Sequence, residues 1–134
     1  MVVVVAKVGT AYYAMSNEKG TTAAPAAVAV TVSTEGTTSK ISDPGEEIQW
    51  KITINNGKYQ FGTGTNYLYC TNGNNGLRVG TNTDNVFSVE AASGYFVNDA
   101  TSRYVGVYNN QDWRSYTSVN NNIKDQTFHI FVKQ

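Results

Sequence analysis

The sequence predicts a single all-β domain over residues 1–134, built from three imperfect copies of a four-strand unit. Three observations lead to this prediction. Apolar residues at helical spacing are nearly absent, short β-branched and aromatic runs alternate with turn residues, and similar motifs return at a regular interval. Short strands with frequent turns are typical of sandwiches, barrels and radial repeats, and the internal repeat selects among them.

The first repeat begins in a strand and contains an insertion. Val2–Val5 is a β-branched run without the basic flank and cleavage site of a signal peptide, so it predicts a strand, and we expect an excised domain or a mature form. The alternating run Val28–Val32 predicts another strand. Ser33–Glu47 is rich in Ser, Thr and Gly and is expected to be an inserted loop.

Turn signals separate the predicted strands. Asn-Gly pairs favour positive φ at both central positions of a tight hairpin turn. They occur at Asn56-Gly57, Asn72-Gly73 and Asn75-Gly76. Asp43-Pro44-Gly45 is a further strong signal, so we expect four turns at these positions.

One repeated motif is an aromatic, a polar and then a branched apolar residue. It occurs at Trp50-Lys51-Ile52, Phe87-Ser88-Val89 and Phe128-His129-Ile130, whose starts lie 37 and 41 residues apart. The first two copies lead through a Gly turn into a second strand. The third copy lies near residue 134, so its expected partner is the strand Val2–Val5, a pairing that would close a barrel.

A second repeated strand predicts the core side. Alternation places an apolar pair on one face in each copy. These pairs are Tyr13 with Met15, Leu68 with Cys70, and Val105 with Val107. A looser set, at Ala27–Val32, Leu77–Val79 and Trp113–Tyr116, completes four strands in each repeat, with repeats at about 1–54, 55–91 and 92–134.

Three such units, each with an aromatic residue in its fourth strand, resemble β-trefoil proteins, including ricin-type lectin domains. The sequences of the strand motifs are more similar still to trefoil-like modules in secreted and surface proteins of gut bacteria. The segments that carry this resemblance are Tyr12–Asn17, Tyr67–Asn72, Gly76–Asn82, Thr101–Tyr108 and Asp112–Arg114. It implies a closed barrel with a hairpin cap and a bacterial extracellular or cell-surface location. Gln126-Thr127-Phe128 departs from the ricin-type Gln-x-Trp signature by its Phe.

The composition of the chain indicates which class of ligand to expect. Charged residues make up 15% of the chain, against roughly 25% in typical soluble domains, and ten acidic residues balance ten basic ones. Because the sequence has no basic patch, we do not expect it to bind nucleic acid or anionic membranes. No apolar run approaches the ~18 residues of a membrane span. A neutral ligand is favoured, and carbohydrate is the obvious class.

Reactive side chains are isolated in the sequence. His129 is the only histidine and is expected at the surface, facing opposite to Phe128 and Ile130, rather than as a general base. A lone histidine without clustered cysteines or carboxylates does not predict a zinc site, and no cofactor is predicted. Cys70 shares the apolar face with Leu68, so a buried inert thiol is expected rather than a nucleophile. We therefore predict no enzyme.

The third repeat offers the strongest cluster of ligand-binding side chains. Trp113 is expected either to stack on a sugar ring, with Asp112 and Arg114 hydrogen-bonding around it, or to start a strand that caps the core. Asp84 and Asp125 are repeat-equivalent and are expected to cap turns or to serve one sugar subsite each. The predicted binding residues are Tyr108, Asp112, Trp113, Arg114, Tyr116, Asn122, Asp125, Arg78 and Asp84.

These observations predict a non-catalytic, lectin-like carbohydrate-binding module of an extracellular or cell-surface protein. We expect a monomer or a module of a larger chain, with a glycan or a surface protein as its partner and without membrane insertion. Two alternatives remain open at this point. One is a protein-interaction or structural accessory module, and the other is a trefoil-type protease inhibitor acting through Ser33–Glu47.

Overall fold

The fold consists almost entirely of β-strands. The structure, a computed structural model, describes residues 1–73 and 76–133. The one helix among these residues is the short 3₁₀ helix η1, Glu46–Ile48, so the all-β prediction is confirmed. The predicted turn at Asn75-Gly76 includes Asn75, which lies outside the described residues.

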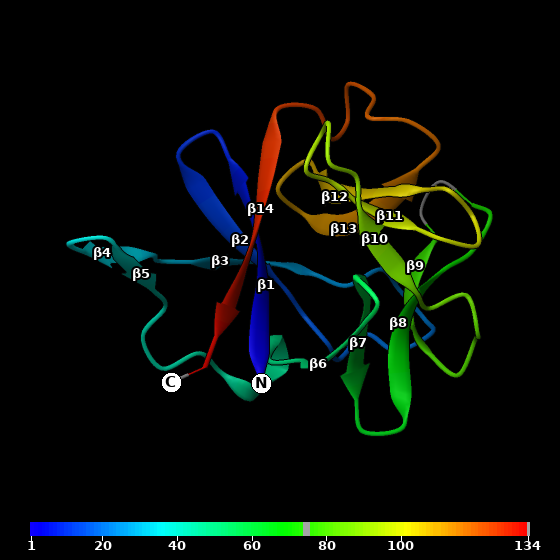
Figure 1. The fold of residues 1–134 in the computed structure, drawn as a ribbon, viewed down its shortest axis with the longest axis horizontal. Coiled ribbons are helices and arrows are strands. Elements are labelled where there is room, and N and C mark those ends of the chain that lie inside the picture. The colour runs from blue at the N-terminus through cyan, green and yellow to red at the C-terminus, as the bar shows by residue number, and fades with distance from the viewer. Residues whose placement is uncertain (74–75, 134) are drawn as a thin grey trace.

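The strands form two sheets and a small arm (Figure 1). The first sheet has the order β14-β1-β2-β3. The second has the order β13-β12-β11-β10-β7-β8-β9, with β6 also paired to β7, and the arm consists of β4 and β5. The strands are β1 (Val2–Val8), β2 (Ala11–Met15), β3 (Ala27–Val30), β4 (Ser33–Glu35), β5 (Thr38–Lys40), β6 (Lys51–Asn55), β7 (Lys58–Thr63), β8 (Asn66–Cys70), β9 (Leu77–Gly80), β10 (Phe87–Val89), β11 (Phe96–Asn98), β12 (Tyr104–Tyr108), β13 (Asp112–Tyr116) and β14 (Gln126–Val132).

Strand β1 lies at the centre of the first sheet and is buried on both faces. It pairs antiparallel with β14 on one side and with β2 on the other. This pairing confirms the prediction that the N-terminal strand joins the third copy of the repeated motif. Residues 2–6 are all buried, with even positions in one core and odd positions in another. A strand buried on both faces has no need of polar alternation, which explains the run of valines.

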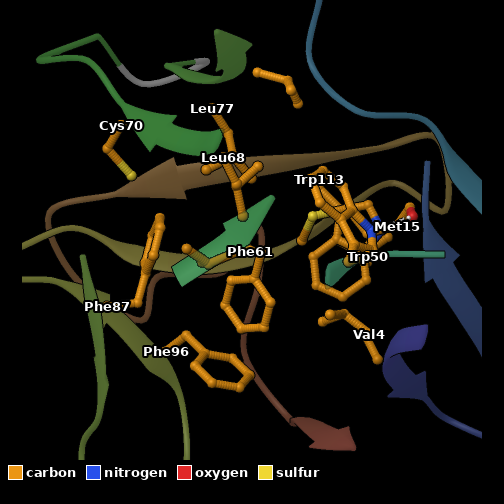
Figure 2. Packing of buried hydrophobic residues seen from close by; sticks show 14 of the residues in the cluster. Val4, Met15, Trp50, Phe61, Leu68, Cys70, Leu77, Phe87, Phe96 and Trp113 are labelled. Atoms are coloured by element: carbon orange, nitrogen blue, oxygen red, sulfur yellow. Dashed lines mark hydrogen bonds between the residues drawn. The ribbon is translucent and has the colours of Figure 1, made fainter. Parts of the chain in front are cut away.

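The main core contains the predicted inner faces of all three repeats (Figure 2). Met15, Leu68, Cys70, Val105 and Val107 are buried in it, and the partly buried Tyr13 packs against it, so the predicted core side is confirmed. Trp50, Phe61, Phe87, Phe96 and Trp113 supply its aromatic volume.

Two tryptophans anchor this core through hydrogen bonds as well as volume. Trp50 Nε1 donates to the backbone oxygen of Met15 at 3.0 Å, and Trp113 Nε1 donates to that of Ala14 at 3.1 Å. Both indoles are fully buried, and Figure 2 shows them side by side near Met15. Each buried N–H therefore has a partner, which burial of an indole requires.

A second, smaller core lies on the other face of the first sheet. Its buried residues are Val3, Val5, Ala14 and Ile48, with Ile41 packed against them. Ile41 and Ile48 come from the segment that follows β3, so this segment covers the sheet. The C-terminal end of this segment is held by Asn17, whose Nδ2 donates to the backbone oxygens of Glu46 at 2.8 Å and Gln49 at 2.7 Å.

The prediction that Ser33–Glu47 is a plain loop is corrected by this arrangement. The segment contains the exposed hairpin β4–β5, whose turn places Gly36 at φ 62°, and the start of η1. A glycine adopts this left-handed backbone without steric cost, so the turn forms in an otherwise polar stretch. An inhibitory role for the segment stays a prediction.

The predicted turns differ in outcome. Asn56 and Gly57 have φ of 53° and 76° in the hairpin between β6 and β7, which confirms the tight turn there. The tight turn predicted at Asn72-Gly73 is wrong, because these residues belong to a longer connection between β8 and β9 and neither has positive φ. Bends occupy residues 42–43 ahead of η1, with Asp43 at φ 45°.

Backbone pairing does not run around a closed barrel in the described part of the chain. Val2 pairs with Trp50, which joins β1 to the residue before β6, and Tyr59 pairs with Phe87, which joins β7 to β10. The all-β class is therefore established. The circle of paired strands that a closed barrel requires is interrupted between β11 and β14, which do not pair.

Aromatic side chains bridge this opening. The ring centroid of Phe128 on β14 lies 4.7 Å from that of Tyr95 and 6.4 Å from that of Phe96 on β11. Tyr95 Oη also donates to the backbone oxygen of Ile123 at 2.5 Å and accepts from the backbone N–H of Gln126 at 3.1 Å. Packing and side-chain hydrogen bonds thus connect the two strands where main-chain pairing does not.

Candidate functional site

The hairpin of β12 and β13 separates its residues onto two faces. Its register pairs Tyr104 with Tyr116, Gly106 with Arg114 and Tyr108 with Asp112, and all six lie on one face. The opposite face consists of buried residues in or beside the main core. We call Tyr104, Tyr108, Asp112, Arg114 and Tyr116 the third-hairpin face.

Arg114 is the centre of the third-hairpin face. Its Nε donates to Asp112 Oδ1 at 2.7 Å and its Nη2 donates to Oδ2 at 3.2 Å, which makes a bidentate ion pair. Its guanidinium carbon lies 4.0 Å from the ring centroid of Tyr108, a cation–π contact. The hydrogen bond with Asp112 raises the pKa of Arg114. The Arg114 and Asp112 side chains remain 20% and 16% exposed, so solvent reaches both groups.

The tyrosines at the far end of this face are held in place. Tyr116 is only 5% exposed, and burial raises the pKa of its hydroxyl. Tyr104 Oη donates to Glu90 Oε2 at 2.6 Å, a hydrogen bond that raises the pKa of Tyr104 and lowers that of Glu90. The sequence prediction omitted Tyr104 and Glu90. Only the alternation of Tyr104 with Gly106 and Tyr108 signals that Tyr104 shares this face.

A glycine lets the next loop dock on the same face. A side chain at Gly106 would place its Cβ 2.6 Å from the Cβ of Ile123, so only glycine fits there. The neighbouring residues Asn122 and Asp125 are exposed. Asn122 donates its backbone N–H to Asn120 Oδ1 at 2.9 Å, and Asp125 has φ 60°, so both belong to the turns of this loop.

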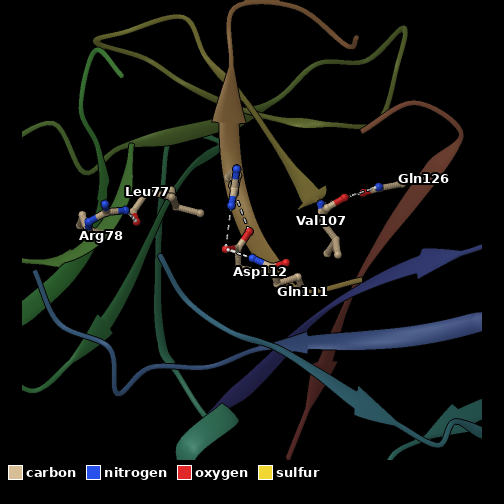
Figure 3. A network of polar contacts seen from close by, with 7 residues as sticks. Leu77, Arg78, Val107, Gln111, Asp112 and Gln126 are labelled. Carbon is tan, nitrogen blue, oxygen red and sulfur yellow. Dashed lines mark hydrogen bonds and ion pairs between the residues drawn. The ribbon is translucent and has the colours of Figure 1, made fainter. Parts of the chain in front are cut away.

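Gln126 ties this loop to β12. Its buried side-chain amide accepts from the backbone N–H of Val107 at 2.9 Å and donates to the Val107 oxygen at 2.7 Å (Figure 3). The glutamine of Gln126-Thr127-Phe128 therefore extends β-type pairing with a buried side chain whose amide is directed at the backbone of Val107.

The stacking role predicted for Trp113 is wrong. Trp113 is 0% exposed and its only polar atom, Nε1, is already bonded to Ala14, so it has no face to offer a sugar. The alternative prediction, that Trp113 starts a strand against the core, is confirmed. Tyr116 is also a packing residue, because 5% exposure leaves little of its ring for stacking.

Two predicted residues of the second repeat lie apart from the third-hairpin face. Arg78 is on β9 opposite Tyr69, its Nη1 donates to the backbone oxygen of Leu77 at 2.8 Å, and Figure 3 shows it well separated from Asp112. Asp84 lies in the connection between β9 and β10, where its backbone oxygen accepts from Cys70 N at 3.2 Å and Asn98 Nδ2 at 2.8 Å. The structure therefore does not unite the nine predicted residues in one site.

The isolated reactive residues lie where the sequence placed them. Cys70 is fully buried, and burial raises the pKa of its thiol to about 11. His129 is exposed, and its register on β14 places it on the face opposite to Phe128 and Ile130. No group of three or more His, Cys, Asp or Glu side chains suited to a metal ion occurs within residues 1–73 and 76–133.

A large groove lies at a different place. It has a volume of about 1390 Å³ and runs between β14 and the segment that contains β5. Its walls include Phe131 and His129 on one side and Lys40, Ile41 and further residues up to position 44 on the other. No motif in the sequence predicted this groove, because it depends on how the insertion folds back beside β14.

The sequence matches no protein-family model, and no curated protein is significantly similar to it. Within the part of the chain that the structure describes, no helix is both long enough and apolar enough to cross a membrane. The chemistry of the third-hairpin face is therefore the basis for a functional proposal.

Proposed function

We propose that this protein is a non-catalytic carbohydrate-binding module of β-trefoil type that acts outside the cell or at the cell surface. The observation that carries this proposal is the partly exposed cluster of Tyr108, Asp112 and Arg114 on the third-hairpin face. An aromatic ring beside a paired donor and acceptor is the combination that sugar rings with vicinal hydroxyls bind.

Recurrence of equivalent contacts supports the trefoil assignment. The hairpins β2–β3, β8–β9 and β12–β13 each direct one face into the main core. The pairs Val2–Trp50 and Tyr59–Phe87 each join the start and the end of one repeat, and Phe96 and Phe128 hold the corresponding positions in the third repeat. Three equivalent junctions and three core-facing hairpins are what a threefold repeat of four strands requires.

The electrostatics of the third-hairpin face favour a neutral glycan. The carboxylate of Asp112 balances the guanidinium of Arg114, and the whole chain has a formal net charge of zero. Remaining donor hydrogens on Arg114 and acceptor lone pairs on Asp112 suit hydroxyl groups, which both accept and donate. We expect affinities per site between millimolar and micromolar, as for a shallow surface that orders few groups.

Two observations support a location outside the cell. The resemblance of the strand motifs to modules of secreted and surface proteins is one. The other is the low charged fraction, 15%, with solubility resting on Asn, Thr, Ser and Gly, which suits a surface that faces glycans.

A glycan array followed by titration of the best neutral ligand tests this proposal. Tyr108→Ala removes the ring face and is expected to weaken binding roughly five- to tenfold, because an aromatic stacking contact contributes on the order of 1 kcal/mol. Tyr108→Phe is the matched control, since it keeps the ring, and it is expected to bind within about twofold of the native protein.

Two results would count against the proposal. An array without any signal argues against a lectin, and equal binding by the native protein and the folded Tyr108→Ala variant places the site elsewhere. Trp113→Ala is unsuitable as a binding test, because Trp113 is a core residue and its loss affects folding.

A further inference from the structure

The large groove beside β14 has the outer face of the first sheet as its floor. Val3 of β1, Tyr12 of β2 and Phe131 of β14 line it, and all three belong to or pack against the second core on that face. Strands β1 and β2 pair with a neighbour on each side, so their main-chain groups are used within the sheet. The floor therefore offers side chains to a ligand, and its central strands offer no backbone pairing.

Aromatic rings are accessible at two places on this floor. On β14, His129 is exposed and Phe131 is half-buried. They are two residues apart and share a face of the strand, with ring centroids 6.3 Å apart and planes inclined at 48°. Tyr12 is the half-buried ring on β2, and the Lys7 ammonium lies 5.6 Å from its ring centroid, within the range of a cation–π contact. The floor thus has flat apolar surfaces at β14 and at β2.

The opposite wall of the groove is polar. It consists mainly of β5 and the residues up to Pro44, which pass beside the lower half of β14 in Figure 1. Thr38, Ser39 and Ser42 of this wall line the groove and are exposed. A hydroxyl group both donates and accepts hydrogen bonds, so this wall suits a ligand whose edge carries hydroxyl groups.

The charges around the groove are balanced. Its two lysines, Lys40 and Lys133, are matched by the carboxylates of Glu35 and Asp43. Charge complementarity therefore favours an uncharged ligand. The groove volume of about 1390 Å³ exceeds the roughly 300–1,000 Å³ of pockets for drug-sized ligands, so it has room for a chain of several units.

A sugar chain fits these surfaces better than a peptide does. An extended peptide gains affinity by pairing its main chain with a strand edge, and the central strands of this floor offer none. A sugar ring has an apolar face that stacks on aromatic side chains, and it carries hydroxyl groups around its edge. The aromatic floor and the hydroxyl-bearing wall match these two parts of a sugar.

We propose that the groove is a second carbohydrate-binding site, which takes a neutral oligosaccharide of several units. One unit stacks on His129 and Phe131, a further unit contacts Tyr12, and hydroxyl groups of the ligand bond to the polar wall. This site extends the proposed function, on which it rests, from a single sugar to a chain. It is separate from the third-hairpin face, because the two sites share no residue.

Neutral gluco-, manno- and xylo-oligosaccharides of one to about six units, titrated into the labelled protein and followed by NMR, test this proposal. Longer chains are expected to shift the amide signals of residues 38–43 and 129–131. Their affinity is expected to rise at least about tenfold from the single sugar to the longest chain, because added units contact further rings of the floor. The signals of Tyr108 and Arg114 report binding at the third-hairpin face in the same titration.

His129→Ala and His129→Phe form a matched pair of variants. His129 is exposed, so both are expected to fold. His129→Ala removes a ring and is expected to weaken groove binding roughly three- to tenfold, whereas His129→Phe keeps a ring and is expected to bind within about twofold of the native protein. Both variants are expected to leave the response of the Tyr108 and Arg114 signals unchanged.

The titration separates failure of the groove site from failure of the proposed function. Shifts at Tyr108 and Arg114 without shifts along the groove would overturn the groove site and leave the proposed function intact. Groove binding that is independent of chain length, or that His129→Ala leaves at native affinity, would overturn it as well. Shifts along the groove alone would support this site and contradict the site on the hairpin. An absence of shifts at both sites would overturn both proposals.

Discussion

The hairpins β2–β3 and β12–β13 have the same topology but opposite outer faces. Both direct their inner faces into the main core. The outer face of β2–β3 is apolar around Ala14 and Val28 and is covered by Ile41 and Ile48. The outer face of β12–β13 displays Tyr108, Asp112 and Arg114 to solvent instead. Equivalent positions of a repeat therefore have different uses, although the core that supports them is shared.

The difference comes from the segment that follows each hairpin. After β3 the chain makes a long excursion, residues 31–48, that returns with two isoleucines to seal the sheet. After β13 a short loop returns with the buried anchor Ile123, which sits on Gly106 and leaves the end of the hairpin uncovered. A binding surface on such a scaffold thus depends on what the connecting segments leave exposed.

The largest expected effect tests the shared inner faces. Trp113→Ala removes a fully buried indole and leaves the Ala14 oxygen without its partner. We expect the free energy of unfolding to fall by about 3–5 kcal/mol, as for other large aromatic deletions, measured by urea denaturation. A loss below about 1 kcal/mol would contradict the core position of Trp113.

The cover on the first hairpin is tested by Ile48→Ala. Ile48 is 3% exposed in the second core, so we expect a loss of about 2–4 kcal/mol in the free energy of unfolding. Ile54→Ala is the matched control, because Ile54 is 60% exposed, and its expected effect is within about 0.5 kcal/mol. Equal effects of the two variants would mean that the insertion does not seal the sheet.

Cys70 lies on β8, in the middle hairpin β8–β9, and its burial makes the stability of the protein depend on pH. Burial raises its pKa from 9.0 to about 11. Between these values the unfolded thiol ionises while the folded one stays protonated, so the unfolded state binds fewer protons. The contribution of the buried thiol to the free energy of unfolding is fully present below pH 9, and roughly 2–3 kcal/mol of it is lost as the pH rises to 11.

Urea titrations of the native protein and Cys70→Ala over this pH range isolate the thiol. All other ionisable side chains are common to the two proteins, so the difference between the two curves reports Cys70 alone. Parallel curves would show that the thiol ionises equally in both states, and would contradict its burial.

The smallest expected effect concerns the uncovered face itself. In a double-mutant cycle with Arg114→Ala and Asp112→Ala, we expect a coupling energy of about 0.5–1 kcal/mol. The pair is bidentate but partly exposed, so solvent screens it. The coupling is expected to shrink in about 1 M salt. A coupling of zero would mean that Asp112 does not position the guanidinium on Tyr108.

Periodicity was sufficient to predict the inner faces of the hairpins. Leu68 with Cys70 and Val105 with Val107 alternate with tyrosine or glycine, and alternation maps directly onto a strand with one face in the core. The same logic failed for Trp113 as a ligand residue. Its neighbours Asp112 and Arg114 are polar, and a lone tryptophan between charges has the same local pattern in a surface turn and in a half-buried strand.

The remaining features depend on contacts between distant segments. The tight turn expected between β8 and β9 at Asn72-Gly73 is missing, whereas the hairpin of β12 and β13 turns at Asn109-Asn110, with φ of 51° and 54°, because asparagine also tolerates the left-handed region. The covering role of Ile48 depends on Asn17, which holds the end of the insertion from 29 and 32 residues away. Local sequence carries little information about such partners.

The pairing of β1 with β14 has a consequence for how the chain folds. The valine-rich strand at residues 2–6 reaches its buried position only when the last strand is present, more than a hundred residues later in the chain. Contacts of such long range give a high contact order, and folds of this kind are slow to form. During synthesis the strand must therefore wait exposed until β14 has also left the ribosome. The valine-rich segment is made more than a hundred residues before the strand that protects it.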